Sequence, residues 1–308
     1  MMQRLLFILV IGLLCYSCDD GDVFQVSLEF EDTFETCGSL VLYKTKDSPP
    51  ESLSIQLQGR TIDEFLNVGD DNVFTQTYEF SSNSNAFNYR TYSTAPDPNF
   101  VFCNDIPPAN IDILVDSESS SGTATVTTIL VEDDNDGIPA DLEGRGAQAE
   151  DGSYPDAIDT DNDGIPNYLD VDDDGDNVLT TAENPEYTEE FGLANAQDTD
   201  LDGIPDYLDN DDDNDGVPTR DEESINADNN PLNDVTEPDN GADYLNPNIS
   251  ISVPATAFIA HPIQQVYTIS VFVENIQIPN LTQDELDFGT LDDSSITNDT
   301  RTGEPIFN

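Results

Sequence analysis

Five short acidic segments in the middle of the chain carry carboxylates at a spacing that could bind metal ions. They are 12 residues long, and we number them loops 1 to 5 in chain order: 132–143, 159–170, 172–183, 198–209 and 211–222. Each has Asp or Glu at positions 1, 3, 5 and 12. Position 6 is Gly in four loops and Asn177 in loop 3, and both residue types accept the positive φ of a sharp turn.

This spacing suits Ca²⁺, a hard cation that takes roughly six to eight oxygen ligands in an irregular shell. Short side chains at alternate positions converge as the loop curls around the ion. The carbonyl of position 7 turns inward, and the carboxylate of position 12 closes the far side. Mg²⁺ fits less well, because it needs a tight octahedral shell and gives up water reluctantly. The sequence therefore predicts several Ca²⁺ ions, about five or more.

The predicted ligands are the carboxylates of positions 1, 3, 5 and 12 and the carbonyl of position 7. The carboxylates are Glu132, Asp134, Asp136 and Glu143 in loop 1, Asp159, Asp161, Asp163 and Asp170 in loop 2, Asp172, Asp174, Asp176 and Glu183 in loop 3, Asp198, Asp200, Asp202 and Asp209 in loop 4, and Asp211, Asp213, Asp215 and Glu222 in loop 5. The carbonyls belong to Ile138, Ile165, Val178, Ile204 and Val217.

The loops keep a register that a merely solvated acidic linker would not need. Only Val171 separates loops 2 and 3, and only Asn210 separates loops 4 and 5. These two pairs begin 39 residues apart. A sixth, decayed copy is a weaker candidate at 235–246, where position 1 has lost its carboxylate. We expect binding within each pair of loops to be mutually reinforcing.

The connecting segments distinguish this pattern from an EF-hand. A segment such as GRGAQAEDGSYPDAI lacks an amphipathic helix, and Pro at position 8 of four loops removes a backbone donor. The tandem DxDxDG…D pattern, with Ile-Pro-x-Tyr-Leu-Asp between paired loops, resembles thrombospondin type 3 repeats of the bacterial kind. The resemblance covers about 132–222 and extends weakly to 246. It implies a chain with almost no regular structure that wraps a line of Ca²⁺ ions with these loop positions as ligands.

The same segment concentrates the charge of the chain. The 308 residues hold 65 Asp and Glu against 8 Lys and Arg, a formal net charge of −57. Residues 131–240 hold 37 acidic and 2 basic residues. Such a chain is repelled by nucleic acid, whose binding needs Lys or Arg, so we expect no nucleic-acid partner. We expect the repeats to be expanded without Ca²⁺ and to form a semi-rigid rod with it.

The N-terminus has the features of an export signal. Arg4 precedes an apolar run from Leu5 to Tyr16 that is too short to span a bilayer. Residues 1–17 followed by Cys18 resemble a bacterial lipoprotein signal, which implies a lipid anchor at Cys18; an ordinary secretion signal is the alternative. The acidic residues of 18–22 form either a surface-export signal or a solvated spacer. We therefore predict an outer-membrane lipoprotein, surface-exposed or facing the periplasm.

Strands are predicted on both sides of the repeats. Apolar and polar residues alternate repeatedly between 23 and 131, as in Leu53-Ile55-Leu57, and turn residues separate the runs. This predicts an antiparallel β-sandwich, with an immunoglobulin-like fold as our guess. Alternation returns at 249–278, which predicts a small β-rich module over 247–308 or strands that dock elsewhere. The predicted fold class is mainly β, with the calcium-binding repeats at 132–246 between the two β-rich parts.

Four other residue types complete the expectations. Export implies an oxidising compartment, so we expect a disulfide between Cys37 and Cys103, with buried free thiols as the alternative. His261, the only histidine, is expected to be a packing or turn residue. The remaining candidates are expected to pack between neighbouring loops, with stacking against a partner as the less favoured role: Tyr168, Leu169, Tyr207 and Leu208.

Three functions are compatible with the sequence. The favoured one is a non-enzymatic calcium-binding lipoprotein whose stiffened repeats present β-modules to a surface protein or glycan. The second is a lipoprotein that captures glycan or peptide on exposed rings, for which the candidates are Phe87, Tyr89, Tyr92, Phe100 and Phe102, although these residues suit a core better. The third is an enzyme or an enzyme accessory domain. Carboxylate pairs are abundant, but no Ser/His/Asp or Cys/His set accompanies them, so no catalytic residue is predicted.

Overall fold

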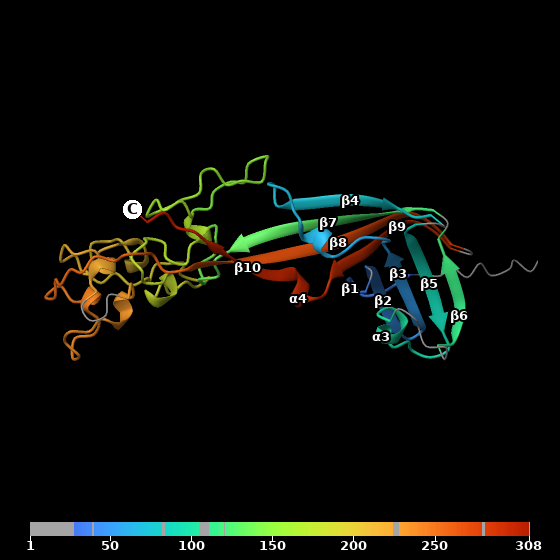
Figure 1. The fold of residues 1–308 in the computed structure, drawn as a ribbon, viewed down its shortest axis with the longest axis horizontal. Coiled ribbons are helices and arrows are strands. Elements are labelled where there is room, and N and C mark those ends of the chain that lie inside the picture. The colour runs from blue at the N-terminus through green and yellow to red at the C-terminus, as the bar shows by residue number, and fades with distance from the viewer. Residues whose placement is uncertain are drawn as a thin grey trace, which may run out of the picture.

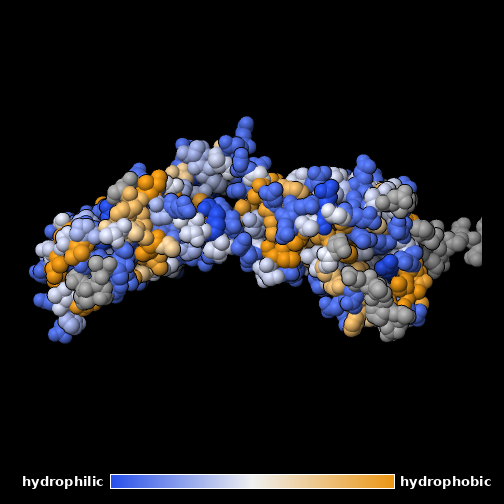
Figure 2. Space-filling model, viewed as in Figure 1, coloured by the Kyte–Doolittle hydropathy of each residue, from blue (hydrophilic) through white to orange (hydrophobic). Residues whose placement is uncertain are grey.

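The computed structural model describes residues 28–307, apart from 39, 82–83, 105–110, 120, 224–227 and 279–280. The predicted signal, Cys18 and the acidic stretch after it lie outside the described residues. Figure 1 shows an elongated molecule with a β-rich body at one end and the repeats at the other. Hydrophilic residues cover much of its visible face (Figure 2). Within the described ranges, no helix has the length and apolar character needed to cross a membrane.

The body is a ten-stranded sheet in the order β4-β7-β8-β9-β1-β2-β3-β5-β6, with β10 paired to β8. The strands are β1 Thr33–Cys37, β2 Val41–Asp47, β3 Pro50–Gln56, β4 Val73–Glu79, β5 Ala86–Tyr92, β6 Ile113–Glu118, β7 Thr123–Asp133, β8 His261–Ile278, β9 Leu281–Leu291 and β10 Asn298–Gly303. In the described connections lie three short helices: α2 Asp63–Leu66, α3 Pro98–Val101 and α4 Ser294–Thr297. β1 and β9 run parallel, whereas their other pairings are antiparallel.

The strands that follow the repeats complete the same sheet as the strands that precede them. β8 pairs with β7 on one side and with β9 and β10 on the other. The mainly-β fold is confirmed. The prediction of a separate module at 247–308 is wrong. Its strands dock into the sheet of the N-terminal region, which is the alternative that the sequence left open.

The two halves of the sheet share one core. Leu42, Ile55 and Phe87 of the β2–β3–β5 half belong to the same buried cluster as Val126 and Val271 of β7 and β8. All five are at most 1% exposed. Alternation explains this arrangement, because every second residue of these strands points to the core. β8 and β9 contribute part of that core, so the strands after the repeats belong to the same fold as the strands before them.

A second small cluster surrounds the expected disulfide. Cys37, at the end of β1, is bonded to Cys103, just after α3, with their Cα atoms 5.3 Å apart. Beside the bond, the rings of Tyr43 and Phe102 stack with centroids 4.5 Å apart. Four of the five rings considered for glycan capture are buried, and only Phe100 of that set is 52% exposed. The four buried rings therefore fill cores, as their pattern suggested.

The repeats form an insertion between β7 and β8. In the described part of this insertion, the regular elements are six short 3-10 helices: η1 Asn167–Leu169, η2 Thr180–Ala182, η3 Asp206–Leu208, η4 Thr219–Asp221, η5 Pro231–Asn233 and η6 Asp243–Leu245. The expected lack of strands and α-helices is therefore found there, isolated bridges aside. Asp133 at the end of β7 faces Gln264 of β8, so both ends of the insertion leave the sheet side by side (Figure 1).

Candidate metal centres

Each loop holds its own acidic side chains with backbone N–H groups. The N–H of position 5 donates to Oδ1 of position 3, and the N–H of position 7 donates to Oδ1 of position 5. In loop 2 these bonds join Asp163 to Asp161 at 3.0 Å and Ile165 to Asp163 at 2.7 Å. Both bonds recur in the other four loops. In loops 2 to 5 the N–H of position 6 also donates to Oδ2 of position 1.

In many of these carboxylates one oxygen is held and the other has no protein partner, whereas both oxygens of Asp172 and of Asp200 accept hydrogen bonds. Asp161 and Asp163 each bury an Oδ2 that accepts no hydrogen bond. The position-12 residues of loops 1, 3 and 5 leave both oxygens buried and unpartnered: Glu143, Glu183 and Glu222. A buried ionised oxygen is costly unless it is paired, so these atoms fit a cation that takes several oxygen ligands.

The free oxygens converge within single loops. Groups whose ligand atoms all lie within 4.8 Å of one another are Asp134, Asp136 and Glu143 in loop 1, Asp159, Asp161 and Asp163 in loop 2, Asp174, Asp176 and Glu183 in loop 3, and Asp198, Asp200 and Asp202 in loop 4. In loop 5, Asp211, Asp213 and Asp215 each bury one unpartnered oxygen. The four predicted carboxylate ligands of loop 3 are buried, whereas Ile204 in loop 4 is 46% exposed.

Glu132 is a predicted ligand whose oxygens are held outside its loop. It lies in β7, and its Oε1 accepts from Arg301 Nε at 2.6 Å and from Gln265 Nε2 at 2.8 Å. Its Oε2 accepts a second bond from Arg301 at 3.0 Å. The local spacing assigned Glu132 to loop 1, but β10 supplies a guanidinium that binds both of its oxygens.

Two aspartates that the spacing did not single out lie at the sites of other loops. Asp212, at position 2 of loop 5, belongs to the loop 3 group of Asp174, Asp176 and Glu183. Asp173, at position 2 of loop 3, buries both oxygens without a partner. Burial, and then the charges of three loop 1 carboxylates led by Glu143, raise the pKa of Asp173 to about 10. The charges of the loop 1 carboxylates therefore act on Asp173.

A sequence signal for these two residues was present. Position 2 is Asp in loops 1, 3 and 5 but Thr in loops 2 and 4. Position 12 is Glu in loops 1, 3 and 5 but Asp in loops 2 and 4. The odd and even loops thus belong to two classes, and only the odd class carries the additional acid.

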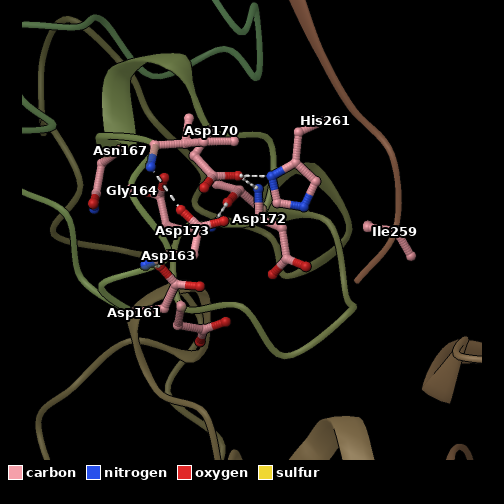
Figure 3. Close-up of polar contacts among 12 residues, drawn as sticks. Asp161, Asp163, Gly164, Asn167, Asp170, Asp172, Asp173, Ile259 and His261 are labelled. Carbon is pink, nitrogen blue, oxygen red and sulfur yellow. Dashed lines mark hydrogen bonds and ion pairs between the residues drawn. The ribbon is translucent and has the colours of Figure 1, made fainter. Parts of the chain in front are cut away.

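His261 joins loop 2 to the sheet. Its Nδ1 lies 2.7 Å from Oδ1 of Asp170, and their side chains are 0% and 1% exposed. Figure 3 shows the carboxylates of Asp170 and Asp172 beside the imidazole ring. Burial lowers the pKa of His261, but the bond to Asp170 and the charges of nearby aspartates outweigh it and raise the pKa overall. The expectation of a packing or turn residue missed this ion pair, because the sequence does not show that β8 begins beside loop 2.

Burial and mutual repulsion raise the pKa values of the loop carboxyl groups. Burial, followed by the charge of Asp136, raises the pKa of Asp134 to about 8. Burial, followed by the charge of Asp134, raises the pKa of Glu143 to about 9. The pKa of Glu222 in loop 5 rises to about 9 for the same two reasons. At neutral pH these groups must hold a proton or be neutralised by a cation.

Two of the three tyrosines at position 10 are buried near candidate metal sites. Tyr207 is 6% exposed, and burial and the charges of Asp173 and Glu143 raise its pKa to about 12. Tyr244 is 4% exposed, and burial and the charges of Asp212 and Glu183 raise its pKa. Tyr207 therefore lies near the loop 1 site and Tyr244 near the loop 3 site.

The other expected packing residues differ in their surroundings. Leu169 packs on Ile165 and on Ile263 of β8, and Tyr168 covers this cluster. Tyr168 also meets the ring of Tyr154 edge-on, with centroids 5.5 Å apart. Leu208 is half-buried beside a 440 Å³ cavity between the two pairs of loops. The rings and leucines therefore pack among the loops and onto the sheet.

The decayed sixth copy keeps the local fold without the acid pattern. The N–H of Thr236 donates to Asp243 at 2.7 Å, as the N–H of Thr199 does to Asp206 in loop 4. Its 3-10 helix η6 occupies the same loop positions as η3 of loop 4. The copy thus contributes Tyr244 to the loop 3 site while position 1, Val235, has no carboxylate.

Comparison with known proteins identifies part of this insertion. No curated protein and no solved structure matches the chain. The match to a family model covers about a fifth of the chain, beginning at the end of β7 and taking in most of loop 1 and all of loops 2 and 3. A domain of this kind is consistent with association with the outer membrane. Residues 133–196 are similar to the family described as BamM C-terminal.

Proposed function

We propose that this chain is a non-enzymatic, calcium-binding outer-membrane lipoprotein. In this proposal Ca²⁺ converts the repeat insertion into a stiff projection from the β-sheet, used for adhesion or structural interaction with a surface protein or glycan. One observation carries the proposal: loops 1, 2, 3 and 5 each leave several carboxylate oxygens buried and unpartnered, and carboxylate ligand atoms converge in loops 1 to 4. The BamM-like match supports a place at the outer membrane and a role related to outer-membrane protein assembly.

The donor set favours Ca²⁺ over softer metals. Within the loops it consists of carboxylate oxygens, and Ca²⁺ takes such hard ligands in flexible shells of roughly six to eight. In loop 3 we propose Asp172, Asp174, Asp176 and Glu183 as ligands, with the carbonyl of Val178. A glutamate with both oxygens free suits bidentate coordination at position 12. The resemblance to thrombospondin type 3 repeats supports the same assignment.

The membrane attachment in this proposal is the lipid on Cys18. It rests on the signal-like leader, since the anchor lies outside the described residues. Several acyl chains would hold the protein, because each buried methylene contributes about 0.8 kcal/mol. Attachment at that end would leave the β-sheet near the membrane and the repeats free to reach outward.

Titration calorimetry of the chelator-treated protein tests the proposal. We expect at least three Ca²⁺ per chain, about five or more if every loop binds, with dissociation constants on the order of 10⁻⁴–10⁻³ M, the range of extracellular modules. Mg²⁺ at the same concentration should compete weakly. Fewer than three bound Ca²⁺ ions per chain would refute the proposal.

A further inference from the structure

We propose that Asp173 and Asp212 are metal ligands supplied across loops. Each belongs to the backbone of one odd loop and completes the site of the preceding odd loop. Asp212 of loop 5 serves loop 3, and Asp173 of loop 3 serves loop 1. This inference rests on the proposed calcium binding and adds an order in which the sites depend on one another.

The geometry of Asp212 separates it from its own loop. Asp213, the next residue, accepts the N–H of Asp215 through Oδ1 at 3.1 Å and faces the loop 5 site. Asp212 and Asp213 are the central residues of a turn that the N–H of Asn214 closes on the carbonyl of Asp211, and the ligand atom of Asp212 lies within 4.8 Å of those of Asp174, Asp176 and Glu183. The N–H of Asp212 donates to Thr219 Oγ1 at 3.2 Å, which fixes the backbone in this orientation. Both carboxylate oxygens of Asp212 are buried without a hydrogen-bond partner, beside Asp174, Asp176 and Glu183.

Asp173 repeats this arrangement one step earlier. Its N–H donates to Thr180 Oγ1 at 3.3 Å, and its side chain is 2% exposed. Both of its oxygens are unpartnered and lie in the field of Glu143, Asp134 and Asp136. Loop 1 needs such a residue, because Arg301 and Gln265 occupy the oxygens of Glu132. By analogy with Asp212, we assign Asp173 as the fourth carboxylate of loop 1, beside the convergent group Asp134, Asp136 and Glu143.

The even loops have no equivalent residue. Thr160 and Thr199 occupy position 2 there, and their hydroxyls donate to Asn167 and Asp206 of the same loops. Loops 1, 3 and 5 therefore form a linked row. The loop 3 site is complete only when loop 5 is folded against it, and the loop 1 site only when loop 3 is.

Two pairs of adjacent residues provide the test. Tb³⁺ replaces Ca²⁺ as the probe in the full-length protein, and its luminescence is excited through nearby tyrosines. Tyr207→Phe and Tyr244→Phe identify the loop 1 and loop 3 signals, because these rings lie beside those sites. We expect Asp212→Asn to weaken Tb³⁺ binding in the Tyr244 signal by about tenfold or more. We expect Asp213→Asn to remove one bound ion in calorimetry and to weaken the Tyr244 signal less than Asp212→Asn does, because Asp213 affects loop 3 only through the folding of loop 5.

The second pair is Asp173 and Asp174, whose substitutions should affect different signals. Asp173→Asn should weaken the Tyr207 signal, whereas Asp174→Asn should weaken the Tyr244 signal. The exposed Asp156→Asn controls for the loss of one charge, and far-UV circular dichroism checks that each variant keeps its fold. Equal effects of both members of a pair on one signal, or effects no larger than that of Asp156→Asn, would overturn the inference. Absence of Tb³⁺ and Ca²⁺ binding in the unchanged protein would instead refute calcium binding itself.

Discussion

At Asp163 the two carboxylate oxygens have different surroundings. Oδ1 accepts the N–H of Ile165 at 2.7 Å, whereas Oδ2 is buried and accepts no hydrogen bond. The backbone bond orients the side chain before any ion arrives, so less conformational freedom is lost on binding. An amide at this position would keep the size and the anchored oxygen but would lose the charge. Substitution by Asn therefore tests coordination with little change in packing.

We predict that replacing Asp163 and Asp176 by Asn together weakens Ca²⁺ binding in loops 2 and 3 more than in loops 4 and 5. The two loops are in contact, since a side chain at Gly175 of loop 3 would collide with Asp161 of loop 2. Calorimetry of the double variant and of the matching Asp202→Asn, Asp215→Asn variant measures the difference. Equal losses at both pairs in both variants would argue against local coupling.

The raised pKa values predict opposite pH dependences with and without metal. The pKa values of Asp134 and Glu143 are about 8 and about 9 in the folded loop, against about 4 in an unfolded chain. The metal-free fold thus holds protons that the unfolded chain has released. Its stabilisation by these groups is fully present below about pH 4 and is lost as the pH rises through 8 to 9.

Ca²⁺ affinity should rise over the same pH range, because binding displaces those protons. Calorimetry in two buffers of different ionisation enthalpy measures the protons released per ion. We expect release at pH 7 and less of it at pH 9, where more of the ligands are already ionised. Binding that releases no proton at pH 7 would show that the free loops are not protonated.

Individual strands and the geometry within each loop could be predicted from the sequence, whereas contacts between distant elements could not. Alternation predicted β3, β4 and β7, because apolar and polar residues alternate along a strand that has one buried and one exposed face. The pairing of β7 with β8 could not be read, since those strands lie on opposite sides of the insertion. Contacts within a loop are local and followed from spacing. Those of Asp173, Asp212, Glu132 and His261 depend on how distant segments come together.

We predict that substitution of His261, at the start of β8, lowers the stability of the folded protein. His261→Leu would leave Oδ1 of the buried Asp170 without its side-chain partner and should destabilise the protein by about 1–3 kcal/mol. His261→Asn keeps a donor of similar reach and should retain more of the stability. Denaturant unfolding of both variants in the presence of chelator measures the difference. Equal midpoints for the Leu and Asn variants would mean that ring packing matters more than the bond.

On the scale of the whole molecule, the negative charge is concentrated in the insertion. The insertion carries most of the acidic residues, whereas the sheet holds a conventional core. In the absence of cations, repulsion within the insertion opposes its compact form, and the sheet does not share this cost. The two parts should therefore respond differently to chelation. The hydrodynamic radius should increase when Ca²⁺ is removed, with little change in the β-sheet circular dichroism signal.

Membrane attachment is a property of the whole molecule that one residue tests. We predict that Cys18→Ser releases the protein from the membrane fraction into the soluble fraction of cells. Cys15→Ser is the matched control, because it also removes a thiol from the leader and should leave attachment intact. Persistent membrane association of Cys18→Ser would exclude lipidation at this residue. Protease treatment of intact cells then distinguishes surface exposure from a periplasmic location.

The side-by-side exit of β7 and β8 also has a mechanical consequence. Tension applied at the far end of the insertion pulls both strands lengthwise in the same direction. β4 resists on one side of the pair, and β9 and β10 resist on the other. Their hydrogen bonds lie across the direction of pull, so they are loaded together in shear rather than opened one after another. A load received by the repeats would thus be shared by several ladders of the sheet at once.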